Sequence, residues 1–417
     1  MNIEFLGGAS EVGRSAIFLK DEKNILLDYG LKIDNKKAQH PMPAHNVDAY
    51  IISHAHLDHC GFSPALYMQN SPVSFGTEPT IEIANILIED AMKIAKAEHM
   101  PQKYFKRQVS AFQRKFVALK YHETSHYAGY NLTLHDAGHI PGAAITCLEK
   151  YNTGKRVVYT GDFKLSPQTM HKGAEVVKSD ILIIESTYAN RNHPDRNSLI
   201  EKFAHEVKEV VDNGGTALIP SFAVGRAQEL LMILEKHGLM ENTYLDGMAT
   251  KVTKVVMNNL KYIRNQDVIE SAMKKAHVVT GQKERTNALR GSSIVVTTAG
   301  MVEGGPIVNY IPRANRHSKI FLTGYQVEGT NGSKLLAGKP ITVDNRKIHI
   351  NIPVAFYDFS AHSGKDDLYK YVKESDPETI ICVHGDKENT NSFANTLKEM
   401  GYDAHSPKVG DKLKVDF

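Results

Sequence analysis

The sequence predicts an α/β protein in which short apolar strands bring polar side chains to one edge of a sheet. Several apolar runs end in a histidine or an acid beside a small residue. Residues from about 190 to 340 alternate strand and helix patterns, which indicates an α/β unit of its own. At 417 residues, the chain is long enough for two domains or for one large domain with an insertion.

The composition is that of an ordinary globular protein, with 41% hydrophobic and 23% charged residues, and a net charge of +3 does not by itself indicate a polyanionic partner. Three cysteines without Cys-x-x-Cys spacing exclude a disulfide framework and favour a reducing compartment. The N-terminus lacks the regions of a signal peptide, and no run approaches the roughly 18 apolar residues of a transmembrane helix. We therefore expect a cytoplasmic protein that does not span a membrane.

The beginning of the chain is predicted to be β-structure. Three strands are expected, at residues 3–6, 15–20 and 25–27. The glycine-rich segment 7–13 lacks the Gly-Lys-Ser/Thr of a phosphate loop and precedes a strand, so it predicts a hairpin turn with close backbone approach. Residues 80–97 carry apolar side chains at helical spacing and stop before Pro101, which predicts a helix.

A dense group of metal-binding side chains follows the apolar run 50–52. Its sequence is His54-Ala55-His56-Leu57-Asp58-His59. Neutral imidazole and carboxylate are ligands that suit Zn²⁺ and its neighbours. A tight loop after the strand can aim the first two histidines at one point and the last two side chains at a second. A surface cluster in a chain with 20 histidines is the alternative, but the spacing and the strand-end position favour a metal centre.

Four later strands repeat this design, since each ends in a potential ligand or acid. The strands and their terminal groups are 132–134 with His139, 156–159 with Asp162, 181–184 with Glu185, and 379–383 with His384. Functional loops of α/β folds gather at one edge of the sheet. One such histidine alone would more often be structural, but four strand ends together with the first cluster predict a shared site.

A second pattern, His122-Glu123-Thr124-Ser125-His126, matches the His-Glu-x-x-His of zinc proteases. That chemistry requires a helix, so that the two histidines share one face. Gly129 and the strand-like flanks 116–119 and 132–134 instead indicate a hairpin. We therefore expect no protease site here.

The segment 190–340 contains the clearest helix signals. Ser198 and Glu201 indicate a capping box for a helix that runs to Val211 and is ended by Gly214-Gly215. A strand at 216–220 and a helix at 225–236 are expected to follow. Residues 251–290 hold nine lysines and arginines against three acids. A solvated helix face explains such a run, and a track for a phosphate backbone is the sharper alternative.

Together these motifs resemble the metallo-β-lactamase fold, with Asp28 at an early strand end, the histidine cluster, then His139 and Asp162. Glu185, His362 and His384 resemble motifs A, B and C of the β-CASP nucleases, and residues 221–229 and 324–330 resemble that family too. The likeness is strongest to the cleavage and polyadenylation specificity factor endonuclease subunit and its archaeal relatives without KH domains. Bacterial RNase J is similar in its metal motifs.

This resemblance implies the architecture. We expect a metallo-β-lactamase αββα sandwich, an α/β class fold, with an inserted α/β β-CASP domain. The implied domains are residues 1–189 for the first part of the metallo-β-lactamase domain, 190–342 for the inserted β-CASP domain and 343–417 for the C-terminal return. The two domains are expected to pack directly on one another, because no linker is recognisable.

The resemblance also implies roles for the site residues. Two Zn²⁺ ions are expected, one held by His54, His56 and His139, the other by Asp58, His59 and His384, with Asp162 bridging them. Asp28 would support the histidine loop. Asp58 also counts as catalytic, and His362, supported by Glu185, would protonate the leaving oxygen. A metal ligand or a phosphate contact is the alternative for His362. Substrate contacts are implied for Ser221, Arg226, Ser360 and Ser363.

The function that the resemblance implies is a zinc-dependent ribonuclease acting on single-stranded RNA, as a homodimer. Endonucleolytic and 5′-to-3′ exonucleolytic cleavage both stay open, as do the sequence preference, the dependence on a 5′ phosphate and the metal used in the cell. The alternatives are a DNA-acting or small-molecule hydrolase of the same superfamily and a non-catalytic RNA-binding scaffold. A histidine at motif C, here His384, accompanies RNA substrates in this family.

Overall fold

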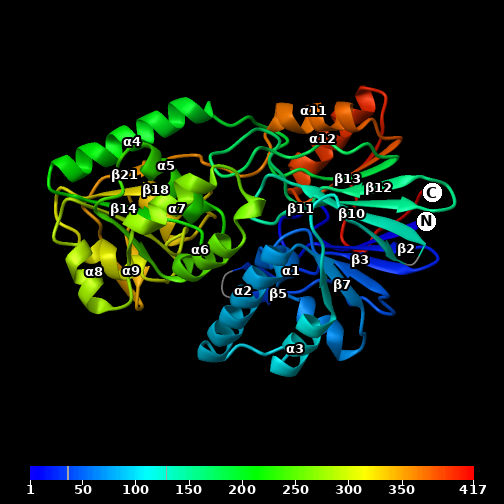
Figure 1. The fold of residues 1–417 in the computed structure, drawn as a ribbon, viewed down its shortest axis with the longest axis horizontal. Helices are drawn as coiled ribbons and strands as arrows, with labels where there is room; N and C mark the ends of the chain where they lie inside the picture. The colour runs from blue at the N-terminus through cyan, green and yellow to red at the C-terminus, as the bar shows by residue number, and fades with distance from the viewer. Residues whose placement is uncertain (35–36, 128) are drawn as a thin grey trace. The chain divides into compact units, whose positions relative to one another are not determined.

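The computed structural model describes residues 1–34, 37–127 and 129–417 and divides the chain into two compact units (Figure 1). Unit 1 comprises Met1–Pro167, Gly173–Asn192 and His362–Phe417. Unit 2 comprises Gln168–Lys172 and His193–Ala361. Unit 2 therefore interrupts unit 1 in the sequence, as expected for an inserted domain.

Unit 1 contains two seven-stranded sheets. The first has the order β24 (Lys412–Lys414), β1 (Asn2–Gly7), β2 (Ala16–Lys20), β3 (Asn24–Leu27), β6 (Ala49–Ile51), β7 (Val73–Gly76) and β8 (Phe116–Ala118). The second has the order β23 (Asp403–His405), β22 (Thr379–Val383), β13 (Ile181–Glu185), β12 (Arg156–Tyr159), β11 (Ala144–Lys150), β10 (Tyr130–Asp136) and β9 (Thr124–Tyr127). A separate two-stranded sheet pairs β4 (Lys32–Asp34) with β5 (Lys37–Gln39).

Helices cover the outer faces of both sheets (Figure 1). On the first sheet these are α1 (Leu57–Cys60), the 3₁₀ helix η1 (Ser63–Met68), α2 (Glu78–Ala97) and α3 (Lys106–Lys115). On the second they are α11 (Lys365–Ser375) and α12 (Lys387–Glu399). Apolar side chains from alternate positions of both sheets, such as Ile3 and Phe5 on β1 and Leu132 and Leu134 on β10, form one buried core. The predicted αββα sandwich is confirmed.

Strand register explains why the candidate ligands meet. β12, β13 and β22 are parallel, and Glu185 pairs with Val383, so the residues that follow these strands emerge at one edge. In the first sheet β3 and β6 are also parallel, with Leu27 opposite Ile51. Asp28 and the histidine loop therefore leave that sheet side by side. Buried parallel strands deliver their loops to a common edge.

Unit 2 is built on a six-stranded parallel sheet with helices around it (Figure 1). The strand order is β16 (His277–Val278), β15 (Thr243–Asp246), β17 (Ser293–Thr297), β14 (Thr216–Pro220), β18 (Lys319–Leu322) and β21 (Val354–Phe356). The helices are α4 (Arg196–Asp212), α5 (Arg226–Lys236), α6 (Met248–Asn258), η2 (Leu260–Tyr262), α7 (Gln266–Lys275), α8 (Gln282–Ala288), α9 (Ile307–Tyr310), η3 (Ile311–Arg313) and α10 (Asn331–Leu336). A small hairpin pairs β19 (Ile341–Val343) with β20 (Arg346–Ile348). The expected α/β unit is confirmed.

Two details differ from the sequence analysis. Asp195, not Ser198, caps α4, because the Asp195 carboxylate accepts hydrogen bonds from the Ser198 backbone N–H and hydroxyl, both under 3 Å. Residues 343–361, which the sequence analysis assigned to the C-terminal return, lie in unit 2, because β21 pairs with β18. The two units describe how the chain packs. The predicted domain boundaries at residues 189 and 342 remain a prediction.

The glycine-rich segment 7–13 forms the expected turn between β1 and β2. Gly8 has a φ of 70°, and a Cβ there would lie 2.9 Å from the Ser15 Cα. Its carbonyl accepts a 2.7 Å hydrogen bond from the backbone N–H of His384. This turn therefore positions a candidate ligand that lies near the other end of the chain. In the described part of the chain, no helix is both long and apolar enough to cross a membrane.

Candidate metal centre

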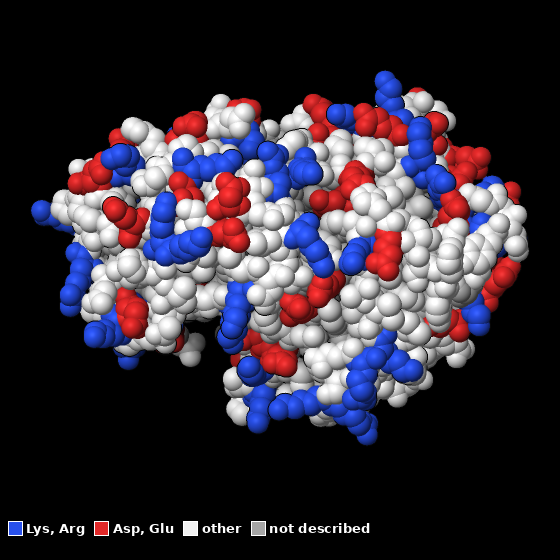
Figure 2. Space-filling model, viewed as in Figure 1, with Lys and Arg blue, Asp and Glu red and all other residues white. Residues whose placement is uncertain are grey.

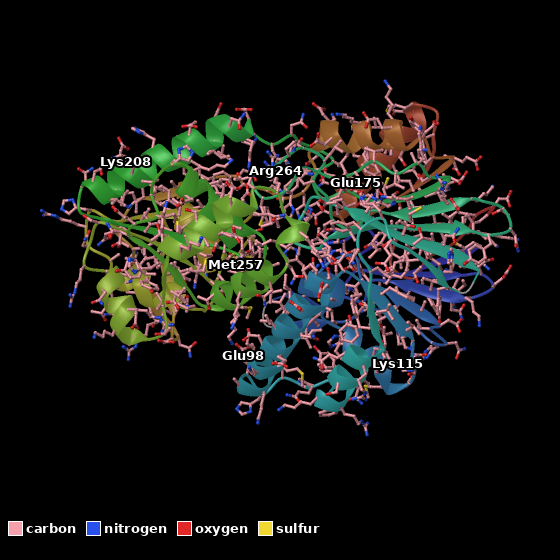
Figure 3. All side chains as sticks on the ribbon, viewed as in Figure 1. Glu98, Lys115, Glu175, Lys208, Met257 and Arg264 are labelled. Atoms are coloured by element: carbon pink, nitrogen blue, oxygen red, sulfur yellow. The ribbon has the colours of Figure 1, made fainter. Side chains whose placement is uncertain are left out.

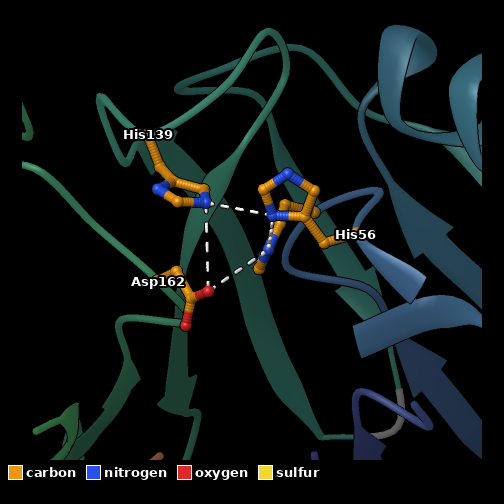
Figure 4. Close-up of side chains that lie close together, drawn as sticks. His56, His139 and Asp162 are labelled. Carbon is orange, nitrogen blue, oxygen red and sulfur yellow. Dashed lines mark hydrogen bonds and ion pairs between the residues drawn. The ribbon is translucent and has the colours of Figure 1, made fainter. Parts of the chain in front are cut away.

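The first group of ligand atoms comes from His54, His56, His139 and Asp162, all in unit 1. The Nδ1 of His56 lies 3.1 Å from His54 Nε2 and 3.2 Å from His139 Nε2. Asp162 Oδ2 lies 3.5 Å from His54 Nε2 and 3.9 Å from His139 Nε2. Figure 4 shows the rings of His56 and His139 and the Asp162 carboxylate directed at one another. Four ligand atoms thus surround one point.

The second group comes from Asp58, His59 and His384. The Nε2 atoms of the two histidines are 3.3 Å apart, and Asp58 Oδ2 lies 3.4 Å from His384 Nε2 and 3.9 Å from His59 Nε2. Asp162 reaches this group with its other oxygen, since Oδ1 lies 3.3 Å from His59 Nε2. The two oxygens of Asp162 therefore face two different groups, as the predicted bridge requires.

The donor atoms fit metal ions. Ligands of a tetrahedral zinc ion with Zn–N bonds of about 2.05 Å are separated by roughly 3.3 Å, which matches the nitrogen–nitrogen distances of 3.1–3.3 Å. Asp162 Oδ1 is buried and accepts no hydrogen bond from the residues that the structure describes. A buried carboxylate oxygen without a hydrogen bond is costly unless a cation satisfies it. The structure thus supports metal binding at this site.

The protonation states of the candidate ligands bear on metal binding. Burial and the neighbouring His59 hold the pKa of His54 well below its usual range, and burial lowers the pKa of His56 to about 4. Both are therefore neutral at neutral pH, which is the form that binds metals. Burial raises the pKa of Asp162, but His384, His59 and His362 outweigh it and hold the pKa well below its usual range.

Burial lowers the pKa of His59, but Asp162, Asp28 and Asp58 outweigh it and hold the pKa well above its usual range, so this ring gives up a proton when its Nε2 binds a metal ion. The centre thus offers anionic carboxylates together with the two neutral imidazoles of His54 and His56.

Asp28, for which support of the histidine loop is predicted, is fully buried and hydrogen-bonded to that loop. Its Oδ1 accepts the backbone N–H of Ser53, and its Oδ2 accepts the hydroxyls of Ser53 and Tyr159 and the Nδ1–H of His59, each at 2.7 Å. Because the Ser53 hydroxyl donates its hydrogen bond to Asp28, its oxygen accepts a hydrogen bond from the Nδ1–H of His54 at 3.0 Å. The Nε2 lone pairs of both histidines are therefore directed at the metal positions.

Ser53 and Tyr159 were missed by the sequence analysis. Ser53 directly precedes the histidine cluster, so its position could have suggested a supporting role. Tyr159 ends an apolar strand, and nothing local distinguishes it from a core tyrosine.

Replacing Asp28 with asparagine is expected to weaken metal binding at the Asp58–His59–His384 group by roughly 10- to 100-fold, because His59 loses its anionic acceptor. Tyr159→Phe should have a smaller effect, since it removes one of four hydrogen bonds to Asp28. Elemental analysis after dialysis against graded chelator measures both variants. Wild-type metal retention in Asp28→Asn would contradict this supporting role.

His362 lies beside the metal-binding residues without belonging to either group of ligands. Its Nδ1 contacts both oxygens of Glu185, at 2.9 and 3.1 Å, and its Nε2 lies 3.9 Å from Asp162 Oδ2. Burial lowers the pKa of His362, but the charges of Glu185 and Asp162 outweigh it and raise the pKa to about 9. A protonated imidazole with Nε2 facing the centre can donate a proton there.

Glu185 and His362 are themselves held by backbone contacts. Glu185 Oε1 accepts the backbone N–H of Phe163 at 2.9 Å, and the buried Lys164 donates from Nζ to the His362 carbonyl at 2.9 Å. The ring of Tyr188 lies edge-on to His362, with centroids 5.9 Å apart. Lys164 and Tyr188 could not be predicted from the sequence, because both are far along the chain from residue 362 and no local pattern shows the contact.

Comparison with known proteins identifies the family. A Beta-Casp domain model matches residues 227–335, a model of the Zn-dependent metallo-hydrolase RNA specificity domain matches 347–407, and one of the anti-Pycsar protein Apyc1 matches 4–211. Probable RNase MJ4 of Methanocaldococcus jannaschii is 39% identical, with 100% of both chains covered. The chain belongs to the β-CASP family of metallo-β-lactamase-fold proteins. The family resemblance found in the sequence is confirmed.

Other β-CASP relatives are also similar over most of the chain. RNase aCSPSF2 of Saccharolobus solfataricus is 33% identical over 99% of this chain and 85% of its own length. Transcription termination factor FttA of Methanocaldococcus jannaschii is 33% identical over 96% of this chain and 69% of its own. A crystal structure of a protein of unknown function from Enterococcus faecalis V583 has a TM-score of 0.65 at 14% identity, covering 99% of both chains, and so shows the shared fold alone.

The zinc-protease pattern of this β-CASP protein forms no helix. His122 lies in a turn, His126 lies on β9, and β9 pairs with β10 as a hairpin. The Glu123 carboxylate accepts the backbone N–H of Lys120, and His126 Nδ1 contacts Asn131 Oδ1 at 2.6 Å. The prediction of a hairpin in place of a protease helix is confirmed.

The residues predicted to contact substrate are distributed over both units. Ser363, in unit 1, is buried, and its hydroxyl accepts the backbone N–H of Leu165 at 3.0 Å. In unit 2, Ser221 and Ser360 are buried, and Arg226 Nη1 donates to the Thr323 carbonyl at 2.7 Å. Their role toward a substrate stays a prediction.

Proposed function

We propose that this protein is a metal-dependent ribonuclease that hydrolyses phosphodiester bonds of RNA. The proposal rests on the position of the Asp162 carboxylate. One of its oxygens faces each group of ligand atoms, and His362 Nε2 lies 3.9 Å from Oδ2. Phosphodiester hydrolysis needs a nucleophile, charge neutralisation and a proton for the leaving oxygen. Two ligand groups with a protonated histidine beside them provide for all three.

Two Zn²⁺ ions are the proposed cofactor, with His54, His56 and His139 as ligands of one, Asp58, His59 and His384 as ligands of the other, and Asp162 shared. When bound, they supply a nucleophile from water at neutral pH and neutralise the charge of the phosphate. The mixed imidazole and carboxylate donors support zinc, which accepts both. Counting metal ions per chain by elemental analysis tests the number and the identity.

The residues of the chain divide the remaining work. Glu185 accepts from His362 Nδ1–H, so it orients the ring and stabilises its protonated form. His362 Nε2 then gives its proton to the oxygen that leaves from phosphorus. Asp28 keeps the loop of His54 and His59 in place. The loss of ligand positions would support the scaffold alternative, and here each predicted ligand is present in the geometry described above.

RNA is proposed as the substrate because the matched RNA specificity domain, residues 347–407, includes His362 and His384. Two relatives that align with 99–100% of this chain, Probable RNase MJ4 and RNase aCSPSF2, are named as ribonucleases. Part of the basic segment 251–290 also supports a polyanionic partner. Lys251 and Lys254 are exposed and three residues apart on α6, so they share one helix face.

Two other basic side chains of the segment 251–290 are engaged in ion pairs. Lys275 pairs with Glu235 and Arg285 pairs with Asp246. In Figure 2, lysines and arginines are interspersed with acids over the face in view. We therefore propose α6 as the part of the predicted track that contacts the phosphate backbone of single-stranded RNA.

The experiment that tests the function uses one sequence made as labelled single-stranded RNA and as labelled DNA. The zinc-loaded protein is expected to cut the RNA, with a much slower reaction on DNA, and to stop cutting after dialysis against a chelator. Added Zn²⁺ should restore activity. Cleavage of DNA at an equal rate, or cleavage that survives the loss of all metal, would overturn the proposal. Labels at the 5′ and 3′ ends separate endonucleolytic from 5′-to-3′ exonucleolytic products.

Replacing Glu123 with alanine is expected to leave RNA cleavage essentially unchanged, because its carboxylate only caps an exposed turn through the Lys120 N–H. The rate of the variant under single-turnover conditions measures this. A loss as large as that caused by replacing Asp58 would restore the protease-like pattern as a functional motif.

A homodimer in the cytoplasm is proposed as the working form. The family resemblance implies the dimer, and all three cysteines are buried and unpaired, which supports a reducing compartment. Light scattering of the purified protein tests the dimer, and a monomer that cleaves RNA at full rate would contradict it.

A further inference from the structure

A further group of histidine and carboxylate side chains lies in unit 1, outside the proposed catalytic centre. It consists of His122, His135 and Glu175, whose potential ligand atoms all lie within 4.8 Å of one another. None of the three belongs to the two groups described above. His122 is the first histidine of the zinc-protease pattern, which the proposed function does not use.

The contacts within this group are short. His122 Nε2 lies 3.2 Å from Glu175 Oε1, and His135 Nδ1 lies 3.3 Å from Glu175 Oε2. The rings of His122 and His135 meet edge-on, with centroids 5.3 Å apart. Burial raises the pKa of Glu175, but the contacts with His135 and His122 outweigh it and lower the pKa. Glu175 is therefore anionic at neutral pH.

The backbone holds the three residues in this arrangement. The N–H of His122 donates to the Leu134 carbonyl at 2.9 Å, and the N–H of Glu175 donates to the Asp136 carbonyl at 2.9 Å. These bonds attach two loops to β10 on either side of His135, which β10 itself carries. The group thus comes from three chain segments that backbone hydrogen bonds hold next to one another. Glu175 is labelled in Figure 3.

We propose that His122, His135 and Glu175 form a further metal site, separate from the catalytic centre, which binds a divalent transition-metal ion such as Zn²⁺. Two imidazoles and one carboxylate are a donor set suited to zinc, nickel or copper. The side chain of His122 is 60% exposed and that of Glu175 is 38% exposed, so water can reach the remaining positions of the ion. An exposed ion with protein ligands from three segments is suited to a structural role.

The ion would connect a turn, a strand and a loop that the chain otherwise joins by hydrogen bonds. A ligand that binds only the folded state stabilises that state in proportion to its occupancy. The competing explanation is a pair of His–carboxylate hydrogen bonds without an ion, and it predicts no dependence of stability on metal. The proposal does not depend on the ribonuclease activity, since the two sites share no residue.

Titration calorimetry tests the proposal with the full-length protein whose catalytic centre has first been loaded with Zn²⁺. Addition of Zn²⁺ is expected to show one further equivalent per chain and to raise the midpoint of thermal unfolding. His122→Ala and Glu175→Gln should each lose both the further equivalent and the metal-dependent shift of the midpoint. RNA cleavage in these variants is expected to stay at the wild-type rate, which shows that they are folded.

His126→Ala is the matched control, because His126 belongs to the same sequence pattern but contacts Asn131 instead. It should keep both the further equivalent and the shift. Absence of a further equivalent in the wild-type protein, or its persistence in His122→Ala, would overturn the proposal. Equal loss in His126→Ala would show nonspecific binding to surface histidines and would overturn it as well.

Discussion

Replacing Asp58 and His59 together with alanine is expected to reduce RNA cleavage to background and to lower the bound metal. Both side chains provide ligand atoms of the Asp58–His59–His384 group, which then retains only His384. The nearby Asp162 Oδ1 also loses its 3.3 Å contact with His59 Nε2. Single-turnover cleavage of labelled RNA and elemental analysis of the same preparation measure the two effects.

The chain offers a matched control in Asp403 and His405. They form an ion pair at 2.9 Å on β23, with side chains 62% and 34% exposed, and they contribute nothing to the metal centre. Replacing both with alanine removes the same two residue types, so cleavage and metal content should stay near wild type. Full activity in the Asp58/His59 variant would rule out the proposed metal assignment.

The His362→Ala variant is expected to slow cleavage by roughly 10²–10⁴-fold, the range for loss of a general acid. Metal content and RNA affinity should stay near wild type, because His362 belongs to neither group of ligand atoms. His384→Ala should instead lose metal, which separates the two histidines. Glu185→Gln is expected to cause a milder loss of rate, since it removes the charge that holds His362 protonated.

A modified substrate decides whether His362 acts as the acid. When sulfur replaces the leaving oxygen of the scissile bond, the thiolate departs without a proton. The penalty of His362→Ala should then largely disappear, while that of Asp58→Ala should remain. Equal penalties on both substrates would move His362 to the alternative roles, a metal ligand or a phosphate contact.

The pH dependence of the rate adds an independent measurement. An acid acts in its protonated form, so its contribution is present below its pKa and is lost as pH rises through it. Glu185 and Asp162 raise the pKa of His362 to about 9, and bound cations lower it from there. The wild-type rate should therefore fall as pH rises through this lowered pKa, at a pH below about 9. The His362→Ala variant should lack this fall.

The sequence by itself determined which residues could form the metal centre. Apolar strands are recognisable from local composition, and each of these ligands lies within a few residues of the end of one. His54, His139, Asp162 and His384 were therefore identifiable without coordinates. The αββα architecture followed from the family resemblance that these residues carry. Short-range signals also showed that the zinc-protease pattern could not be a helix.

Only the tertiary structure decided how these residues act together. Strand pairing such as Glu185 with Val383 joins segments about 200 residues apart, and no local pattern encodes such a partner. The orientation of the two Asp162 oxygens, the Tyr159 hydrogen bond to Asp28 and the placement of β21 in unit 2 all depend on pairing of that kind.

The pattern 122–126 illustrates the same division. Its residue types indicated metal chemistry, and its flanks excluded the helix that a protease needs. The hairpin then separates the functions of its two histidines, because His126 contacts Asn131 while the turn directs His122 to His135 and Glu175. Residue identity sets which ligands are available, and the long-range packing of backbone segments sets which of them meet.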